Sequence, residues 1–127
     1  MRRLLTLMLA VESMAACSPA TAVTIDPKND VHCSVLTFYF HGLAVHDGAS
    51  NTQIRATKGL EDWYAAKLRS HSGGRYADPT LLQRELGPVL DTIKANPDAM
   101  RDAAKACVSR AAADPSFNDF ARPYMRH

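Results

Sequence analysis

The sequence lacks most of the short motifs that identify a known chemistry. It contains no Gly-x-Ser-x-Gly turn for a nucleophilic serine, no glycine-rich phosphate loop and no Cys-x-x-Cys pair. Basic residues form no block, and 15 Lys and Arg nearly balance 13 Asp and Glu, so there is no electrostatic footprint for a nucleic acid. These absences argue against serine-nucleophile and phosphate-loop enzymes, thioredoxin-like exchange, c-type haem attachment and nucleic-acid binding.

Long hydrophobic runs are also absent. The apolar run at the N-terminus, residues 4–11, is far shorter than the roughly 20 residues that a membrane-spanning helix needs. Two arginines precede it and small residues follow it, which is the layout of a secretory signal. We therefore expect residues 1–22 to be the signal peptide of an exported bacterial protein and residues 23–127 to form a single helical domain. Because Glu12 places a charge at the end of the run, an amphipathic or buried N-terminal helix is the alternative.

Two processing sites compete at the end of this segment. Met-Ala-Ala-Cys over residues 14–17 resembles a bacterial lipobox, in which Cys17 is lipidated and becomes the first residue, although methionine stands where that motif prefers leucine. Ala-Thr-Ala over residues 20–22 fits the small-x-small rule of ordinary signal peptidase, with cleavage before Val23. The short apolar run slightly favours the lipobox, and both routes remain open. We expect contact with a membrane only through the signal or a lipid anchor.

Cysteine is scarce, with one residue each at positions 17, 33 and 107. Either processing route removes Cys17 as a free thiol and leaves Cys33 and Cys107 as a pair in an oxidising compartment. We predict a disulfide between them, which would close a loop of about 75 residues and stabilise the fold by roughly 4 kcal/mol in the chain-entropy account. Two separate buried thiols are the alternative.

Three Asx-Pro steps divide the second half of the chain: residues 78–79, 96–97 and 114–115. Each places a capping side chain directly before a proline at the favoured first helical position. They predict the starts of three helices, and a further helix is expected over about residues 51–70. Gly87 and Pro88 are expected to interrupt or kink the helix that begins at residue 79.

The segment before these helices is ambiguous, because residues 33–40 contain Val, Thr, Phe and Tyr, which also suit a strand. Its apolar residues recur at helical spacing over a stretch longer than a typical strand. We therefore predict a helix that is capped by Asn29 or Asp30 and ends near residues 47–48. The chain as a whole is predicted to be an all-α array of four to five helices stapled by one disulfide.

Apolar positions at helical spacing predict the inner face of each helix. They are Cys33, Leu36, Phe40, Leu43 and Ala44; Ile54, Leu60, Trp63, Tyr64 and Leu68; Leu82, Leu86, Val89, Leu90 and Ile93; Met100, Ala103, Ala104, Cys107, Val108 and Ala111; and Phe117 with Phe120.

No group of titratable residues has the spacing of a known site, so we predict no catalytic residue, no metal and no cofactor. His41 and His46 are five residues apart and diverge by about 140° on a helix, unlike an i, i+4 metal pair. An inter-helical pocket containing His32, His41 or His46 is the alternative, and it would make the protein a carrier of a metal or small ligand. Glu61 and Asp62 are adjacent, and we expect them on a solvated face rather than as an acid–base pair.

Trp63 and Tyr64 lie in the most distinctive string of the chain, Leu-Glu-Asp-Trp-Tyr-Ala-Ala-Lys-Leu over residues 60–68. Burial of Trp63 in the core is the preferred interpretation. An aromatic patch that meets a partner is the other, which makes Trp63 and Tyr64 a candidate interaction surface. Otherwise Tyr64, Lys67 and Arg69 are expected to be ordinary helix surface.

The string Ala-Cys-Val-Ser-Arg-Ala-Ala-Ala-Asp-Pro-Ser-Phe over residues 106–117 resembles the C-terminal helices of a broad group of uncharacterised exported bacterial proteins. In size, helix content and its single bridge, the chain also resembles the small periplasmic acid-stress chaperones of Gram-negative bacteria. The cysteines here are more widely spaced than in those chaperones, so the resemblance assigns no functional residues.

Three functions follow as expectations. The leading one is a non-enzymatic helical module of the cell envelope that binds another, unidentified protein. The second is an acid-stress chaperone: without Arg2, Arg3 and Glu12 the net charge of +2 becomes +1, and protonation of all carboxylates and histidines would raise it to about +18, which expands a chain that the bridge holds together. The third is the small-ligand or metal carrier.

Overall fold

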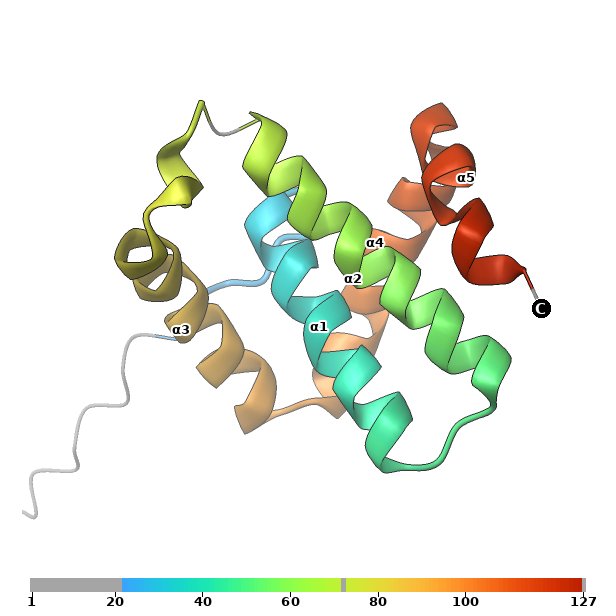
Figure 1. The fold of residues 1–127 in the computed structure, drawn as a ribbon. Coiled ribbons are helices and arrows are strands. Elements are labelled where there is room, and N and C mark those ends of the chain that lie inside the picture. The colour runs from blue at the N-terminus through green and yellow to red at the C-terminus, as the bar shows by residue number, and fades with distance from the viewer. Residues whose placement is uncertain (1–21, 72, 127) are drawn as a thin grey trace, which may run out of the picture.

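The computed structural model describes residues 22–71 and 73–126, and most of these residues lie in helices (Figure 1). The order is α1 (Asp30–His46), α2 (Asn51–His71), η1 (Arg75–Ala77), α3 (Pro79–Ala95), η2 (Asp98–Met100), α4 (Arg101–Ala113), α5 (Pro115–Ala121) and η3 (Arg122–Met125), where η denotes a 3-10 helix. The described residues contain no strand, so the all-α prediction is confirmed, including the helix over the ambiguous residues 33–40. Cys17 and both processing sites lie outside the described residues.

Side-chain caps begin the helices as the sequence predicts. The Asn29 side chain accepts a hydrogen bond from the backbone N–H of Val31 at 2.8 Å at the start of α1. Asp78 and Asp114 accept in the same way at 2.9 Å at the starts of α3 and α5, each followed by its proline. The Asn96 step differs, because it opens η2, and α4 itself begins at Arg101.

The predicted interruption of α3 at Gly87 and Pro88 is wrong, since α3 runs as one α-helix from Pro79 to Ala95. The Pro88 ring is exposed, while Val89 and Ile93 are buried in the core. Packing of this inner face against α1 therefore holds the helix together across a locally unfavourable pair of residues.

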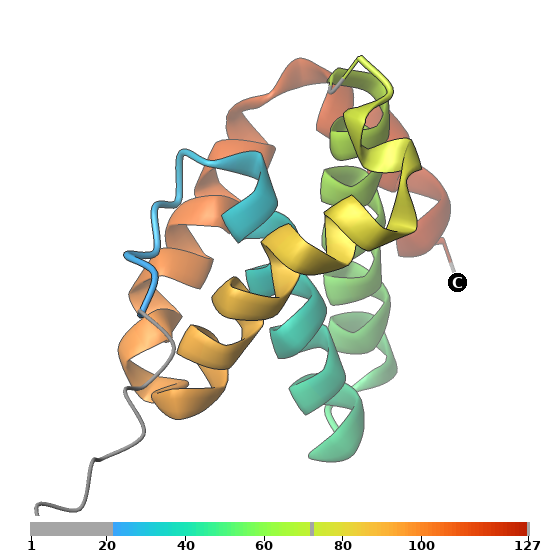
Figure 2. The same ribbon diagram turned by 90° about the vertical axis from the view of Figure 1, so that its left-hand side faces the viewer.

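α1 lies at the centre of the array and packs against α2, α3 and α4. Figure 2 shows it between α4 on one side and α2 on the other. α5 and η3 cover another part of α2, where Gly59 allows the Tyr124 ring to approach: a Cβ on Gly59 would lie 3.3 Å from Cγ of Tyr124. The buried residues form one core cluster, consisting of Cys33, Val35, Leu36, Trp63, Tyr64, Val89, Ile93, Cys107 and Ala111.

The disulfide between Cys33 and Cys107 is present, with the two Cα atoms 5.6 Å apart. It joins the first turn of α1 to the middle of α4, and both cysteines are fully buried. The predicted disulfide is confirmed, and it links two helices as expected.

The predicted inner face of α4 needs one correction. Cys107 and Ala111 are buried, but Val108 is 43% exposed. Successive helical residues point about 100° apart, so a face centred on Cys107 turns Val108 toward solvent. Among the described residues, no helix has the length and apolar character needed to cross a membrane.

Loss of the disulfide should destabilise the protein strongly. For a sequence separation of 74 residues, we expect the free energy of unfolding to fall by about 4 kcal/mol in the Cys33→Ala/Cys107→Ala double variant, because the unfolded chain regains the entropy of the open loop. Urea unfolding followed by circular dichroism measures this. The matched control is Cys17→Ser, which should unfold like the wild type. A double variant as stable as the control would contradict the prediction.

Candidate functional site

A groove of about 630 Å³ lies over α1, between α2 and α3. The two walls meet near η1, which joins the end of α2 to the start of α3, and they separate from there (Figure 1). α2 and α3 make few direct contacts because each packs on α1 instead. The groove is therefore a consequence of the central place of α1.

The groove is lined mainly by apolar side chains. They include Val35 and Phe38 from α1, Leu68 from α2, and Leu82, Leu86 and Leu90 from α3. Phe38 is 54% exposed and is the largest of the exposed apolar side chains among the described residues. Apolar grooves are common places for a ligand or a partner protein to bind.

Sequence reasoning missed this groove. The leucines of α3 were predicted as core, and they are only half-buried, while Phe38 falls outside the inner face predicted for α1. The one signal available was the width of the apolar stripe on α3, where Leu82, Leu86 and Leu90 form a row beside Val89 and Ile93.

Two charged residues line the groove among the residues that the structure describes, and both come from α2. Glu61 is already engaged: its Oε1 lies 3.5 Å from Nζ of Lys58, and its Oε2 is buried 3.9 Å from Nε2 of His41, with no hydrogen-bond partner. Arg69 is exposed and takes part in no hydrogen bond or ion pair with the described residues. Within the described part of the chain, the groove thus presents one unpaired positive charge.

The expectation that Glu61 and Asp62 share a solvated face is wrong, because their side chains are only 18% and 32% exposed. Asp62 lies 2.9 Å from Nζ of Lys58 and accepts a hydrogen bond of 2.6 Å from the hydroxyl of Tyr124. Burial alone would raise the pKa of the Asp62 carboxyl, but the hydrogen bonds from Tyr124 and Lys58 outweigh it and lower that pKa. The hydrogen bond from Tyr124 fastens η3 to α2.

Beside the groove lies a set of contacts between η1 and α3 that we call the η1 clasp, made by Arg75, Tyr76 and Glu85. The Tyr76 hydroxyl donates a hydrogen bond of 2.6 Å to Oε2 of Glu85, and Arg75 pairs with its Oε1. The hydrogen bond from Tyr76, together with Arg75, lowers the pKa of the Glu85 carboxyl against the effect of burial. Tyr76 also lines the groove, so the clasp fixes its wall.

Trp63 and Tyr64 do not form an interaction surface, which corrects that candidate site. Their exposed fractions are 4% and 0%, and the Trp63 ring packs against Phe117 with centroids 5.3 Å apart. The preferred interpretation of Trp63 as a core residue is confirmed. Tyr64 is fully buried, so its place on the predicted inner face of α2 is confirmed and the expectation that it is ordinary helix surface is wrong.

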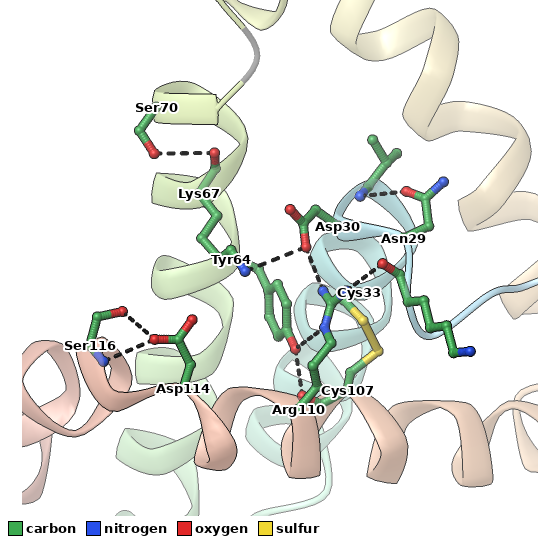
Figure 3. A network of polar contacts seen from close by, with 12 residues as sticks. Asn29, Asp30, Cys33, Tyr64, Lys67, Ser70, Cys107, Arg110, Asp114 and Ser116 are labelled. Atoms are coloured by element: carbon green, nitrogen blue, oxygen red, sulfur yellow. Dashed lines mark hydrogen bonds and ion pairs between the residues drawn. A yellow bond between two sulfur atoms is a disulfide. The ribbon is translucent and has the colours of Figure 1, made fainter.

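The hydroxyl of Tyr64 belongs to a polar network beside the disulfide (Figure 3). It donates a hydrogen bond of 2.5 Å to the carbonyl of Cys107, and burial raises the pKa of this phenol. Arg110 lies over the Tyr64 ring and donates hydrogen bonds of 2.5 Å to Asp30 and to the carbonyl of Lys28. The network ties α1, α2 and α4 to Lys28 in the segment before α1, which is a structural role.

The three histidines considered for a metal engage separate partners. His32 accepts a hydrogen bond of 2.8 Å from the backbone of Asp26, and burial lowers the pKa of its imidazole despite that neighbour. Nδ1 of His41 lies 2.8 Å from Oγ1 of Thr57, and His46 is exposed. Within residues 22–71 and 73–126, no three His, Cys, Asp or Glu side chains are placed to hold a metal ion.

Comparison of the chain with known protein families, curated proteins and solved structures finds no match to any of them. The groove is therefore interpreted from its geometry.

Removal of the Tyr64 hydroxyl should be costly. Tyr64→Phe removes this hydrogen bond from the core, so we expect the free energy of unfolding to fall by about 0.5–1.5 kcal/mol. Urea unfolding measures the loss. Tyr39→Phe is the control, because Tyr39 is half-buried and its hydroxyl makes no hydrogen bond among the described residues. Equal effects of the two substitutions would contradict the prediction.

Acid should release the η1 clasp. The pKa of Glu85 in the folded protein lies below its unfolded value of about 4.3, so the clasp stabilises the fold above that pH and the contribution is lost as the pH falls through the folded pKa. We expect the melting temperature to drop less between pH 6 and pH 3, measured by calorimetry, in Glu85→Gln than in the wild type. Asp91→Asn, an exposed change on the same helix, should behave like the wild type, and an unchanged drop in Glu85→Gln would contradict the prediction.

Proposed function

We propose that the protein is a non-enzymatic binding module of the cell envelope that receives an apolar segment of another protein in the groove between α2 and α3. The observation that carries this proposal is the open apolar groove, with Phe38 54% exposed at its surface. Large apolar side chains left exposed in a groove are a common feature of protein-binding sites.

The arrangement of charges favours binding over catalysis. Glu61 and Arg69 are eight residues apart on α2, which separates them by about 12 Å along the helix axis. Chemistry on a substrate needs groups within hydrogen-bond reach of the same atoms. The remaining lining is mainly aliphatic and aromatic, which suits complementary packing.

The openness of the groove favours a protein segment over a small molecule. Sites for small ligands usually enclose 70–90% of the ligand surface, by rough survey values. Here the floor residue Phe38 is itself more than half exposed, so an occupant would be covered from one side only. When the occupant is a segment of a protein, the rest of that protein covers the side of the segment that faces away from the groove.

The location in the envelope is part of the same proposal. The N-terminal segment has the layout of a secretory signal, and the disulfide between Cys33 and Cys107 is typical of an oxidising compartment. Attachment through Cys17 would add a lipid anchor.

Site-specific photo-crosslinking in the producing cell tests the proposal. A benzoylphenylalanine at position 38 should cross-link to a protein partner, identified by mass spectrometry, because it replaces an exposed ring in the groove. The control is the same group at position 108, which is exposed on α4, a helix that does not line the groove. Identical products from both positions, or a stoichiometric small molecule in the native mass spectrum, would show the proposal to be wrong.

A further inference from the structure

We propose that the occupant of the groove is an amphipathic α-helix of the partner protein, and that it carries an acidic side chain that pairs with Arg69. This inference rests on the proposed function and specifies the chemistry of the partner.

The dimensions of the groove fit a short helix. On the α2 side the lining runs from Glu61 to Arg69, and on the α3 side from Pro79 to Leu90. At 1.5 Å per residue these walls are about 12 Å and 17 Å long, which corresponds to two or three helical turns. An apolar stripe of that length occurs on one face of an ordinary amphipathic helix.

The arrangement of the helices leaves room for one more. α2 and α3 pack on α1 and diverge from each other, so the surface of α1 around Phe38 faces the space between them. Helices pack at interaxial distances of about 8–10 Å through side chains that interdigitate. A fourth helical neighbour of α1 at this position would bury Phe38 together with the leucine row of α3.

The charge at the groove selects an acidic partner. Oε1 of Glu61 pairs with Lys58 and its Oε2 is buried, so its carboxylate is poorly placed to bind an incoming group. Arg69 is exposed beside Leu68 and makes no ion pair among the described residues. A carboxylate on the partner would complete this site, and charges at the rim of an apolar interface mainly set specificity and orientation.

Designed peptides of about 15 residues test the inference with the full chain. Each peptide has leucines at i, i+3, i+4 and i+7 and differs only in one flanking residue, which is Glu, Gln or Lys. Fluorescence anisotropy should show the Glu peptide binding about three- to tenfold more tightly than the Lys peptide. Arg69→Glu should invert that order, and Phe38→Ala should weaken all three peptides by about tenfold or more.

Arg84→Glu is the matched control, because Arg84 is an exposed arginine on α3 that does not line this groove. It should leave the order of the peptides unchanged. Phe38, Arg69 and Arg84 are all exposed, so their variants are expected to fold, and circular dichroism checks this.

The outcomes separate the two proposals. Peptides that bind through Phe38 but keep their order in Arg69→Glu would overturn the acidic partner and leave the proposed function intact. Failure of every peptide, with cross-linking at position 38 still observed, would overturn the helical occupant alone. Arg69-dependent binding of decanoate without peptide binding would assign the groove to a carboxylate amphiphile and overturn both.

Discussion

The attachment of α1 to α4 is the constraint on which the rest of the fold depends. The disulfide between Cys33 and Cys107 fixes it covalently, and the Tyr64 hydroxyl fixes α2 to the same point through the carbonyl of Cys107. Arg110 adds Asp30 and the carbonyl of Lys28 to this junction. Three helices and the residues just before α1 thus meet around one buried disulfide.

A central helix held in this way determines where the surface of the molecule is left open. α1 packs against α2, α3 and α4, so these three helices are held in place by α1 and need not contact one another. The hydrogen bond from Tyr64 to the carbonyl of Cys107 joins α2 to α4, whereas among the described residues α2 and α3 come together at η1, which contacts both helices. The groove follows from this unequal closure.

The sequence predicts the elements of this fold well because their signals are local. Caps at Asn29, Asp78 and Asp114, each followed by helical periodicity, place the helix starts. The disulfide was predicted from the number of cysteines and the expected export of the chain. Pro88 misled the prediction, because the packing of Val89 and Ile93 is a tertiary effect that local propensity does not contain.

The site was less predictable because it depends on the angle between helices. Periodicity assigns one inner face to a helix, but α1 packs against three neighbouring helices. Phe38 is exposed because none of these three helices covers the side of α1 on which it lies. Trp63 and Tyr64 stand out in the sequence because of their size, and both are buried in the core. The sequence does not single out Arg69, because it does not show whether an arginine lies next to an acidic partner in the folded protein.

The burial of the sulfur bridge has a kinetic consequence. Both cysteines have no exposed surface, so an attacking thiolate cannot reach either sulfur atom until the junction around it opens. The rate at which an external thiol reduces the protein is then set by how often that opening occurs, in the same way that hydrogen exchange reports on transient exposure of amides. The rate of reduction of the disulfide therefore measures how often the core opens around it.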